Sequence, residues 1–345
     1  LRSKVPAGRL ISLDLEPAQR MPGVRAVISA PDAPGLYGVM VADHPLFVID
    51  EIRYTGEPIA AVAAETLEQA QAAAAAIRVE IEEREPLFTM AQALAPGAHE
   101  IHPGWRGYEM LAGEGARNGN ISWESTVVRG DVDAAFARED VKVIETLYRA
   151  GRQNQTPFEP RVVVASYERG RFVITTSTQF PWSVRNGVAR MVGVQPSDVR
   201  VIVPPVGGGF GLKWEMSLEP FAAILARETG RPVKLVNSRQ DEQQTALCRE
   251  NAEIRIRSAV TADGEIVGRE GIMVMDCGGY SGEQPFLCSM VTHTLFGSYK
   301  LGSARLVSQS VYTNTPPTGA FRACCGTYCV AALETHTDEI CAQMG

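Results

Sequence analysis

Three short segments of the chain carry residue types that could bind or polarise a ligand. The clearest is the run Val-Gly-Gly-Gly-Phe-Gly at residues 206–211, which follows an apolar stretch that ends in two prolines. Clustered glycines let the backbone bend sharply and bring its N–H groups close to a ligand. The sequence beyond the run favours a helix, and N–H groups at a helix start would attract an anion or a polarised oxygen. A plain flexible turn is the alternative, because Leu212 stands where both common phosphate-binding motifs require glycine.

The second and third segments contain an amide and a guanidinium. Gln179 lies in Thr-Gln-Phe-Pro after a β-rich run, where its amide could hydrogen-bond a ligand oxygen or simply face solvent. Arg322 lies in the small-residue run at 319–326, where a guanidinium suits a phosphate or a buried anion. Cys325 and Cys329 could share a helix face. Without a second cysteine pair, buried core thiols are a stronger interpretation than zinc or an iron–sulfur cluster.

The composition limits the classes of partner and compartment. The 345 residues include 33 Lys and Arg against 40 Asp and Glu, a net charge of −7. Nucleic acids and anionic membranes bind basic faces, so neither is the expected partner. No apolar run approaches the roughly 18 residues of a membrane span. The cysteines number seven and run from Cys248 to Cys341, which indicates reduced thiols and a cytoplasmic protein.

The elements that must position these segments fall into two α/β units. In the first, residues 24–29 and 59–64 are β-rich, and Thr66 is placed to cap a helix. Apolar and charged residues then alternate from 77 to 82, which is the period of a half-buried strand. These signals predict a small α/β domain over residues 1–86 that is incomplete at its N-terminus.

Residues 87–125 are predicted to be a linker between the units. Glycine and proline crowd this stretch, Gly113 and Gly115 among them, and regular apolar spacing fades. A free loop of this length is uncommon, so we expect three aromatic residues to hold it against a surface. These are Trp105, Tyr108 and Trp123.

A larger mixed α/β unit is predicted over residues 126–345, incomplete at its C-terminus. Its strand-like runs are 141–148, 161–167, 172–176, 199–203, 233–236, 254–260 and 266–275. Asp263-Gly264 between the last two indicates a hairpin. Helices are predicted over 182–192 and 217–229, each followed by a glycine that ends it. A last helix over 327–344 is expected to carry an apolar face without a partner in this chain, made of Val330, Leu333, Ile340 and Met344.

Taken in order, the motifs resemble those of the molybdopterin-binding large subunit of the xanthine dehydrogenase and aldehyde oxidase family. The likeness covers nearly the whole chain. The motifs are Tyr-Thr-Gly-Glu-Pro-Ile-Ala-Ala-Val at 54–62, Arg-Gly-Asp-Val at 129–132, Phe-Glu-Pro-Arg at 158–161, Thr-Gln at 178–179, Gly-Gly-Gly-Phe-Gly at 207–211 and Gly-Ala-Phe-Arg at 319–322. The resemblance implies an α/β hammerhead domain followed by the first part of a molybdopterin-binding domain.

The resemblance also implies an activity, namely hydroxylation of an electron-poor carbon or an aldehyde with oxygen from water. In this family the dithiolene of a pterin holds molybdenum, usually without a protein ligand, so the protein acts around the metal. The cofactor would be molybdopterin or its cytosine dinucleotide. Gln179 resembles the residue that hydrogen-bonds the molybdenum oxo group, and Arg322 resembles the arginine beside the metal. The segment packed against that oxo group corresponds to Gly208, Gly209, Phe210 and Gly211.

The expected substrate pocket departs from the family's purine-oxidising branch. Trp214 replaces a glutamate, Met290 replaces an arginine, and Cys324 replaces an aromatic residue that sandwiches the ring. In the carbon monoxide-oxidising branch, a copper-binding cysteine stands where this chain has Ala323. The small-molecule substrate is therefore expected to be an aromatic N-heterocycle or an aldehyde. Arg322 lies near Cys324 and would lower the pKa of its thiol, unless that thiol only fills a tight turn.

The resemblance implies partners as well. The glycine-flanked glutamate that serves the family as base lies in a later half that this sequence lacks, so the chain alone should not turn over. A C-terminal remainder or split-subunit partner, a [2Fe–2S] subunit and an FAD subunit are expected. A non-catalytic binding or assembly protein is the alternative, since pocket groups are lost. Retention of Gln179, Phe210 and Arg322 together favours the enzyme.

Overall fold

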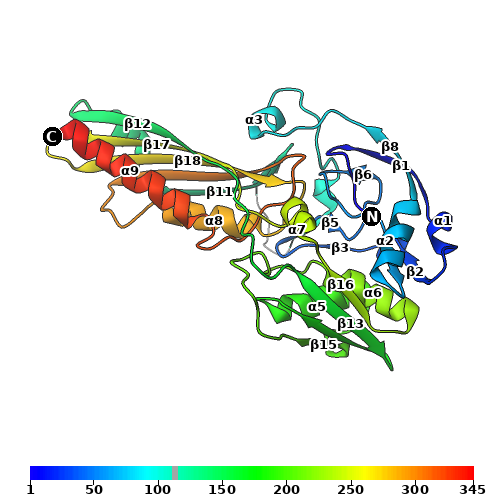
Figure 1. The fold of residues 1–345 in the computed structure, drawn as a ribbon. Helices are drawn as coiled ribbons and strands as arrows, with labels where there is room; N and C mark the ends of the chain where they lie inside the picture. The colour runs from blue at the N-terminus through cyan, green and yellow to red at the C-terminus, as the bar shows by residue number, and fades with distance from the viewer. Residues whose placement is uncertain (111–115) are drawn as a thin grey trace.

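The computed structural model describes residues 1–110 and 116–345, so Gly113 and Gly115 of the predicted linker lie outside the described residues. Over these ranges the chain is a mixed α/β protein, as predicted, with helices packed on separate sheets (Figure 1). No helix within them is long and apolar enough to cross a membrane.

A three-stranded antiparallel sheet with the order β6-β1-β8 organises the N-terminal unit. Its strands are β1 (Gly8–Asp14), β6 (Glu51–Ile52) and β8 (Arg78–Glu83). Beside it lie the antiparallel pair β2 (Val24–Ile28) and β7 (Ala61–Ala64), and the helices α1 (Glu16–Gln19) and α2 (Leu67–Ala76). The predicted strands and helix are confirmed, and Thr66 caps α2 by accepting a hydrogen bond from the N–H of Gln69 at 3.2 Å.

Short elements make up the described part of the predicted linker. They are α3 (Met90–Ala93), β9 (Glu109–Met110) and β10 (Ala116–Asn118), and β9 pairs with β4 (Val41–Ala42) beside the pair β3 (Leu36–Tyr37) and β5 (His44–Pro45). The Tyr108 hydroxyl lies 2.7 Å from Nδ1 of His102, and Arg117 lies over the rings of Trp105 and Tyr108. Trp105 and Tyr108 therefore make contacts within this stretch, and their expected role in holding it against another surface stays a prediction. Trp123 instead belongs to a strand of the large sheet.

Six strands in the order β10-β11-β19-β18-β17-β12 form that large sheet. Beyond β10 they are β11 (Ile121–Arg129), β12 (Val141–Ala150), β17 (Ala252–Thr261), β18 (Ile266–Gly278) and β19 (Ser303–Tyr312). The predicted hairpin at Asp263-Gly264 joins β17 to β18. The sequence analysis missed β19, which runs parallel to β18, because Ser308 and Ser310 are buried there and obscure the apolar alternation.

A four-stranded sheet, β15-β14-β13-β16, carries the segments around the candidate site. Its strands are β13 (Val162–Glu168), β14 (Arg171–Thr176), β15 (Val199–Ile202) and β16 (Val233–Val236). The helices α5 (Pro181–Val192) and α6 (Glu219–Thr229) pack on it around a buried apolar cluster, and α7 (Arg239–Thr245) follows β16. Gly193 and Gly230 take left-handed conformations and end α5 and α6, as predicted. Because α6 also packs on β2 and β7, it joins this sheet to the N-terminal unit.

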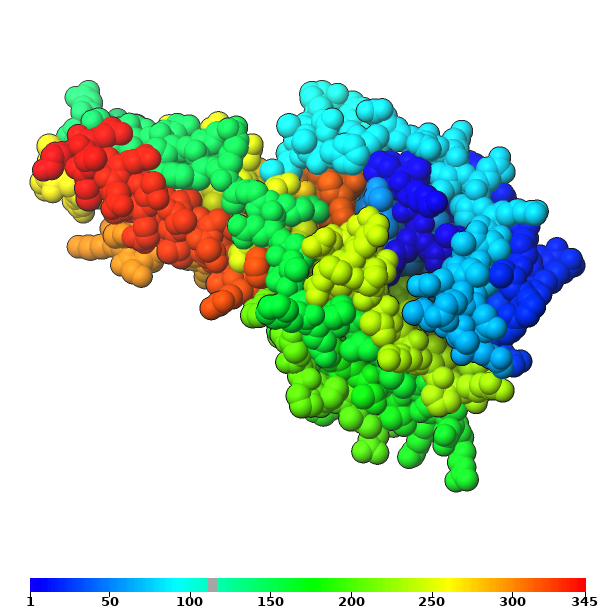
Figure 2. Space-filling model, in the orientation of Figure 1, coloured from blue at the N-terminus to red at the C-terminus, as the bar shows by residue number. Residues whose placement is uncertain are grey.

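The large sheet and its helices extend to one side of the rest of the molecule (Figure 2). These helices are α4 (Val132–Phe136), α8 (Gln284–Thr294) and α9 (Gly326–Met344). The expectation of an unpartnered apolar face on the last helix is wrong for Leu333 and Ile340, which are buried within the chain. Ile340 packs with Ile144 and Val260, because β12 and β17 present apolar side chains to α9. Val330 alone of these candidates is a strongly exposed apolar residue, at 47%.

Candidate functional site

The three segments singled out from the sequence meet at one place in the structure. The N–H of Gly211 donates to Oε1 of Gln179 at 2.9 Å, and the N–H of Arg322 donates to the carbonyl of Phe210 at 2.9 Å. A Cβ on Gly211 would lie 2.1 Å from the carbonyl oxygen of Ala320, so only glycine permits this approach. The amide, the glycine run and the arginine loop therefore form one candidate site.

Gln179 lies just beyond β14 and its side chain is exposed, with the amide oriented by the protein. Its backbone N–H donates to the carbonyl of Lys213 at 2.8 Å, while its Oε1 accepts from Gly211. A Cβ on Gly209 would lie 2.3 Å from that Oε1, so the glycine makes room for the amide. Because the amide oxygen is occupied, the Nε2 group is left as the donor available to a ligand.

The glycine run does not begin a helix, and this prediction is wrong. Residues 210–213 form a turn in which the N–H of Leu212 donates to the carbonyl of Gly209 at 2.9 Å. The helix α6 begins only at Glu219. The backbone is left-handed at Gly208 and Gly211, with φ of 93° and 103°. A right-handed helix cannot pass through these positions, so none begins at the glycine run. The glycine N–H groups therefore gain no attraction for anions from a helix dipole.

Unfavourable backbone conformations cluster at the same place. Among the described residues five non-glycine residues have positive φ, and three of them belong to the site: Phe210 at 54°, Ala323 at 68° and Cys324 at 42°. Such conformations cost on the order of 1–3 kcal/mol each and persist where the surroundings enforce them. The local sequence carried no signal for this strain, which marks the glycine run and the arginine loop as constrained for a function.

The side chain of Arg322 is exposed, while hydrogen bonds from Arg249 and to Phe210 hold its backbone in place. Its guanidinium has no hydrogen-bond or ion-pair partner among the described residues, which leaves it available to an anionic ligand. Arg249, which is 5% exposed, donates to the carbonyls of Phe321 at 3.0 Å and Arg322 at 2.9 Å, and also to that of Cys324. The sequence analysis missed Arg249, because nothing around it in the sequence indicates that it binds carbonyls of a loop 70 or more residues away.

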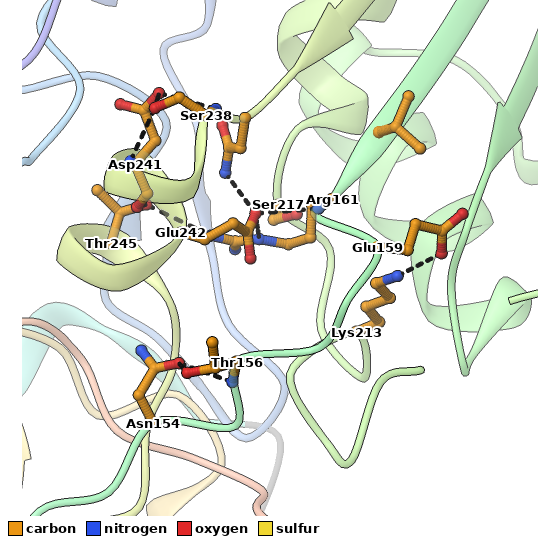
Figure 3. Close-up of polar contacts among 12 residues, drawn as sticks. Asn154, Thr156, Glu159, Arg161, Lys213, Ser217, Ser238, Asp241, Glu242 and Thr245 are labelled. Carbon is orange, nitrogen blue, oxygen red and sulfur yellow. Dashed lines mark hydrogen bonds and ion pairs between the residues drawn. The ribbon is translucent and has the colours of Figure 1, made fainter. Parts of the chain in front are cut away.

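An ion pair beside the glycine run also escaped the sequence analysis. Oε2 of Glu159 accepts from Nζ of Lys213 at 2.5 Å, as Figure 3 shows. The same oxygen accepts from the N–H of Gly207 at 2.9 Å. Lys213 is 2% exposed. A separate buried pair, Nε of Arg161 with Oε1 of Glu242 at 2.9 Å, joins the start of β13 to α7. The Phe-Glu-Pro-Arg motif contains both Glu159 and Arg161, and it was the only available signal for either pair.

A cavity of about 310 Å³ opens beside Phe180, the residue after Gln179. Phe180 stacks on Trp214 with ring centroids 4.7 Å apart, so Trp214 lies behind an aromatic wall of this cavity. Met290 and Cys324 instead pack, partly buried, against the apolar cluster of the six-stranded sheet, to which Trp214 does not belong. The cavity volume is at the lower end of the range for small-molecule sites.

Two acids lie close to the cavity or the arginine loop, of which Glu215 is half-buried and Glu283 is buried. Glu215 lines the cavity, and Oε1 of Glu283, at the start of α8, accepts from the N–H of Ala320. Burial raises the pKa of Glu283 to about 7. Burial, followed by the nearby charges of Glu283 and Asp43, raises the pKa of Glu215 well above its ordinary value. The raised pKa favours the protonated form of the Glu215 carboxyl, which could donate or accept a hydrogen bond in the cavity.

The thiols are less reactive than the sequence suggested. Burial, and then the nearby carboxylate of Glu283, raises the pKa of Cys324 to about 11, so the expected lowering by Arg322 is wrong. Cys325 and Cys329 are buried in the core, and all seven cysteines are unpaired. Within the described ranges no group of three His, Cys, Asp or Glu side chains is placed to hold a metal ion.

Comparison with known protein families decides the identity of the fold. The sequence model of the molybdopterin cofactor-binding domain matches residues 114–345. That of the aldehyde oxidase and xanthine dehydrogenase a/b hammerhead domain matches residues 1–85. The chain belongs to the xanthine dehydrogenase and aldehyde oxidase family. The resemblance inferred from the six motifs is thereby confirmed.

Two relatives within this family are covered by this chain to different extents. It is 33% identical over 348 residues to a probable xanthine dehydrogenase subunit of Bacillus subtilis, a match that takes in 100% of this chain and 45% of that protein. It is 35% identical over 324 residues to the nicotinate dehydrogenase large molybdopterin subunit of Eubacterium barkeri, covering 93% of this chain and 73% of that protein. The chain thus spans less than half the length of the Bacillus relative.

Solved structures of family members have the same fold. The aldehyde oxidoreductase from Desulfovibrio gigas superimposes with a TM-score of 0.90 at 27% identity, over 100% of this chain and 38% of that one. Quinoline 2-oxidoreductase from Pseudomonas putida 86 gives a TM-score of 0.85 at 29% identity, over 100% of this chain and 44% of that one. The predicted mixed α/β fold of this family is confirmed.

Proposed function

We propose that this chain forms part of the large subunit of a molybdenum hydroxylase, which oxidises an aromatic N-heterocycle or an aldehyde with oxygen from water. Membership in the family supports the cofactor class. The observation that carries the proposal is the convergence of Gln179, the glycine run and Arg322, which the hydrogen bonds of Gly211 and Arg322 hold together. A protein that only retained the fold would not need strained backbone at Phe210 and Ala323.

The residues present fit a molybdenum–molybdopterin group. Gln179 offers an amide donor, and the absence of side chains at Gly209 and Gly211 lets the glycine run pack directly against Gln179 and Ala320. Arg322 adds an exposed positive charge for an anionic cofactor. We propose that Gln179, Arg322 and the segment Gly208, Gly209, Phe210 and Gly211 contact the cofactor, either as molybdopterin or as its cytosine dinucleotide. Once bound, the cofactor supplies two-electron redox chemistry, while the protein orients it and surrounds it with donors.

The cavity beside Phe180 supports a flat aromatic substrate. Its walls include the Phe180 ring backed by Trp214, together with Tyr37 and Trp182. Planar rings stack well on such faces. The protonated carboxyl that the raised pKa of Glu215 favours could donate a hydrogen bond to a ring nitrogen, a group that an aldehyde of a carbocycle lacks. Trp214 is the pocket residue this geometry favours, and Met290 and Cys324 are proposed to contribute from the α8 side.

Exposed apolar side chains around the site support further partners. The large apolar residues that are more than a third exposed include Phe158, Trp182, Val206, Phe210, Trp214 and Phe286. Exposed apolar patches mark interfaces, and relatives of this chain are named as subunits. We propose that a C-terminal remainder or split-subunit partner covers this surface and brings the base. An iron–sulfur subunit and an FAD subunit would then carry electrons away.

The proposed domains are residues 1–86, a linker over 87–125 and the partial molybdopterin-binding domain over 126–345. The unpaired state of all seven cysteines, which the structure describes in full, supports a reducing, cytoplasmic location.

Metal content and oxygen origin test the proposal. The complex that contains this chain is purified and its molybdenum is counted, and turnover of quinoline and benzaldehyde is then followed in ¹⁸O-labelled water. About one molybdenum per complex and labelled product are expected. A complex without molybdenum would support the alternative of a non-catalytic binding or assembly protein.

A further inference from the structure

The carboxylate of Glu159 has been given no part in catalysis so far, yet it contacts the glycine run at two points. One oxygen of Glu159, Oε2, accepts from the N–H of Gly207 at 2.9 Å and from Nζ of Lys213 at 2.5 Å. These two donors are the first and last residues of the 207–213 loop. A single oxygen therefore joins the two ends of the loop. Figure 3 shows its contact with Lys213.

The contact between Glu159 and the loop is close as well as polar. A Cβ on Gly207 would lie 2.6 Å from the Cβ of Glu159, so glycine is required for the carboxylate to reach both donors. The backbone N–H of Glu159 also donates to the carbonyl of Gly207 at 3.2 Å. Burial alone would raise the pKa of Glu159, but the hydrogen bonds from Lys213 and Gly207 lower it below its ordinary value. The carboxylate therefore stays ionised at neutral pH.

The loop in turn sets the position of Gln179 by two hydrogen bonds. Lys213 accepts from the backbone N–H of Gln179 at 2.8 Å, and Gly211 donates to its Oε1 at 2.9 Å. Nζ of Lys213, buried at 2% exposure, has no other partner than Glu159 among the described residues. A shift of Lys213 would move both the backbone and the amide of Gln179.

We propose that Glu159 is a positioning residue of this site: by closing the base of the 207–213 loop, it holds the amide of Gln179 where the molybdenum cofactor needs a donor. The proposal rests on the proposed function for its catalytic consequence. The positioning of the loop by Glu159 does not rest on the proposed function, and it can be measured without turnover. A displacement of about 1 Å in a catalytic group can lower the rate as much as 10²-fold.

The test compares the variant Glu159→Gln with a control variant of a second ion pair. Both are measured in the complete subunit with its partner chains. Trp214 follows Lys213 directly and stacks on Phe180, so its fluorescence reports the loop. In each background its contribution is obtained by difference from the Trp214→Phe form. The control is Glu242→Gln, which breaks the buried ion pair that Glu242 of α7 forms with Arg161. Glu159→Gln should shift the emission and acrylamide quenching of Trp214 and lower kcat more than it changes KM. Glu242→Gln should lower Tm and leave the fluorescence and kcat unchanged.

A double variant separates positioning from stability. Glu159→Gln leaves a buried ammonium without its counter-charge, which destabilises a fold strongly, and Glu159→Gln with Lys213→Met removes that charge. If the double variant regains the wild-type Tm while its Trp214 signal and kcat remain altered, the positioning role is supported. Recovery of all three together, or an unchanged Trp214 signal in Glu159→Gln, overturns it. If wild-type protein lacks molybdenum, the proposed function fails, and the fluorescence arm still decides whether Glu159 positions the loop.

Discussion

Gln179 offers the sharpest test of the proposed cofactor site, because its two amide atoms have separate tasks. Oε1 accepts from Gly211 at 2.9 Å within the protein, and Nε2 is left for the cofactor. Gln179→Ala removes both, whereas Gln179→Glu keeps an acceptor for Gly211 and removes only the donor. The two variants therefore separate the hydrogen bond that orders the loop from the one that serves the reaction.

The structure sets different magnitudes for these two losses. The bond from Gly211 ends on an exposed side chain, so losing it should lower the free energy of unfolding by about 0.5–1.5 kcal/mol, and only in Gln179→Ala. Losing a preorganised donor typically lowers kcat by about 10²–10³-fold, or roughly 2.7–4 kcal/mol in activation free energy. Both variants should show this fall in kcat with a smaller change in KM.

The assay measures steady-state kinetics, molybdenum content and Tm on the same preparations of the complete enzyme. Full metal loading is expected in both variants, since no protein side chain is proposed to hold the metal. Near-normal kcat at full loading in Gln179→Glu would refute the assignment of Nε2 as donor. Loss of molybdenum together with activity would show that the amide serves cofactor retention instead.

Three further predictions follow from the packing and the pKa shifts. Gly211→Ala should lower Tm and molybdenum content much more than Gly230→Ala, because both glycines have positive φ but only the first Cβ would meet a backbone oxygen, at 2.1 Å; equal effects would contradict the close approach. Labelling by a thiol reagent at pH 8, followed by mass spectrometry, should modify exposed Cys341 well before Cys324, whose pKa burial raises to about 11; early labelling of Cys324 would contradict that burial. Burial raises the pKa of Glu283 to about 7 from an ordinary value of 4.5, so the folded state holds its proton more tightly. Stability from this group should be complete below about pH 4.5 and lost as pH rises to 7, by at most about 1.4 kcal/mol per pH unit, and Glu283→Gln should flatten this slope in urea titrations.

Local signals in the sequence were sufficient for the elements that form from their own residues. The capping box at Thr66, the alternation over β8, the hairpin turn at Asp263-Gly264 and the glycine ends of α5 and α6 each depend on neighbours within a few positions. The same holds for the choice of Gln179, the glycine run and Arg322, because the functional groups of these residues indicate by themselves which ligands they could bind.

The features that could not be predicted from the sequence depend on contacts between distant segments. Serines of β19 are buried because β18 and β11 pair with this strand on both sides. The apolar face of α9 packs on strands that lie as far as about 190 residues earlier in the chain. The glycine run begins no helix, since left-handed backbone at Gly208 and Gly211 lets it meet Ala320 instead.

The sequence by itself indicated the family, the elements that have strong local signals and the residue types of the site. The tertiary structure alone decided that Glu159 and Lys213 pair at the base of the glycine loop, that Arg249 fixes the carbonyls beneath Arg322, and that Cys324 is a weak acid. The physical reason is that burial and counter-charge set these properties, and both are supplied by residues that no local pattern connects.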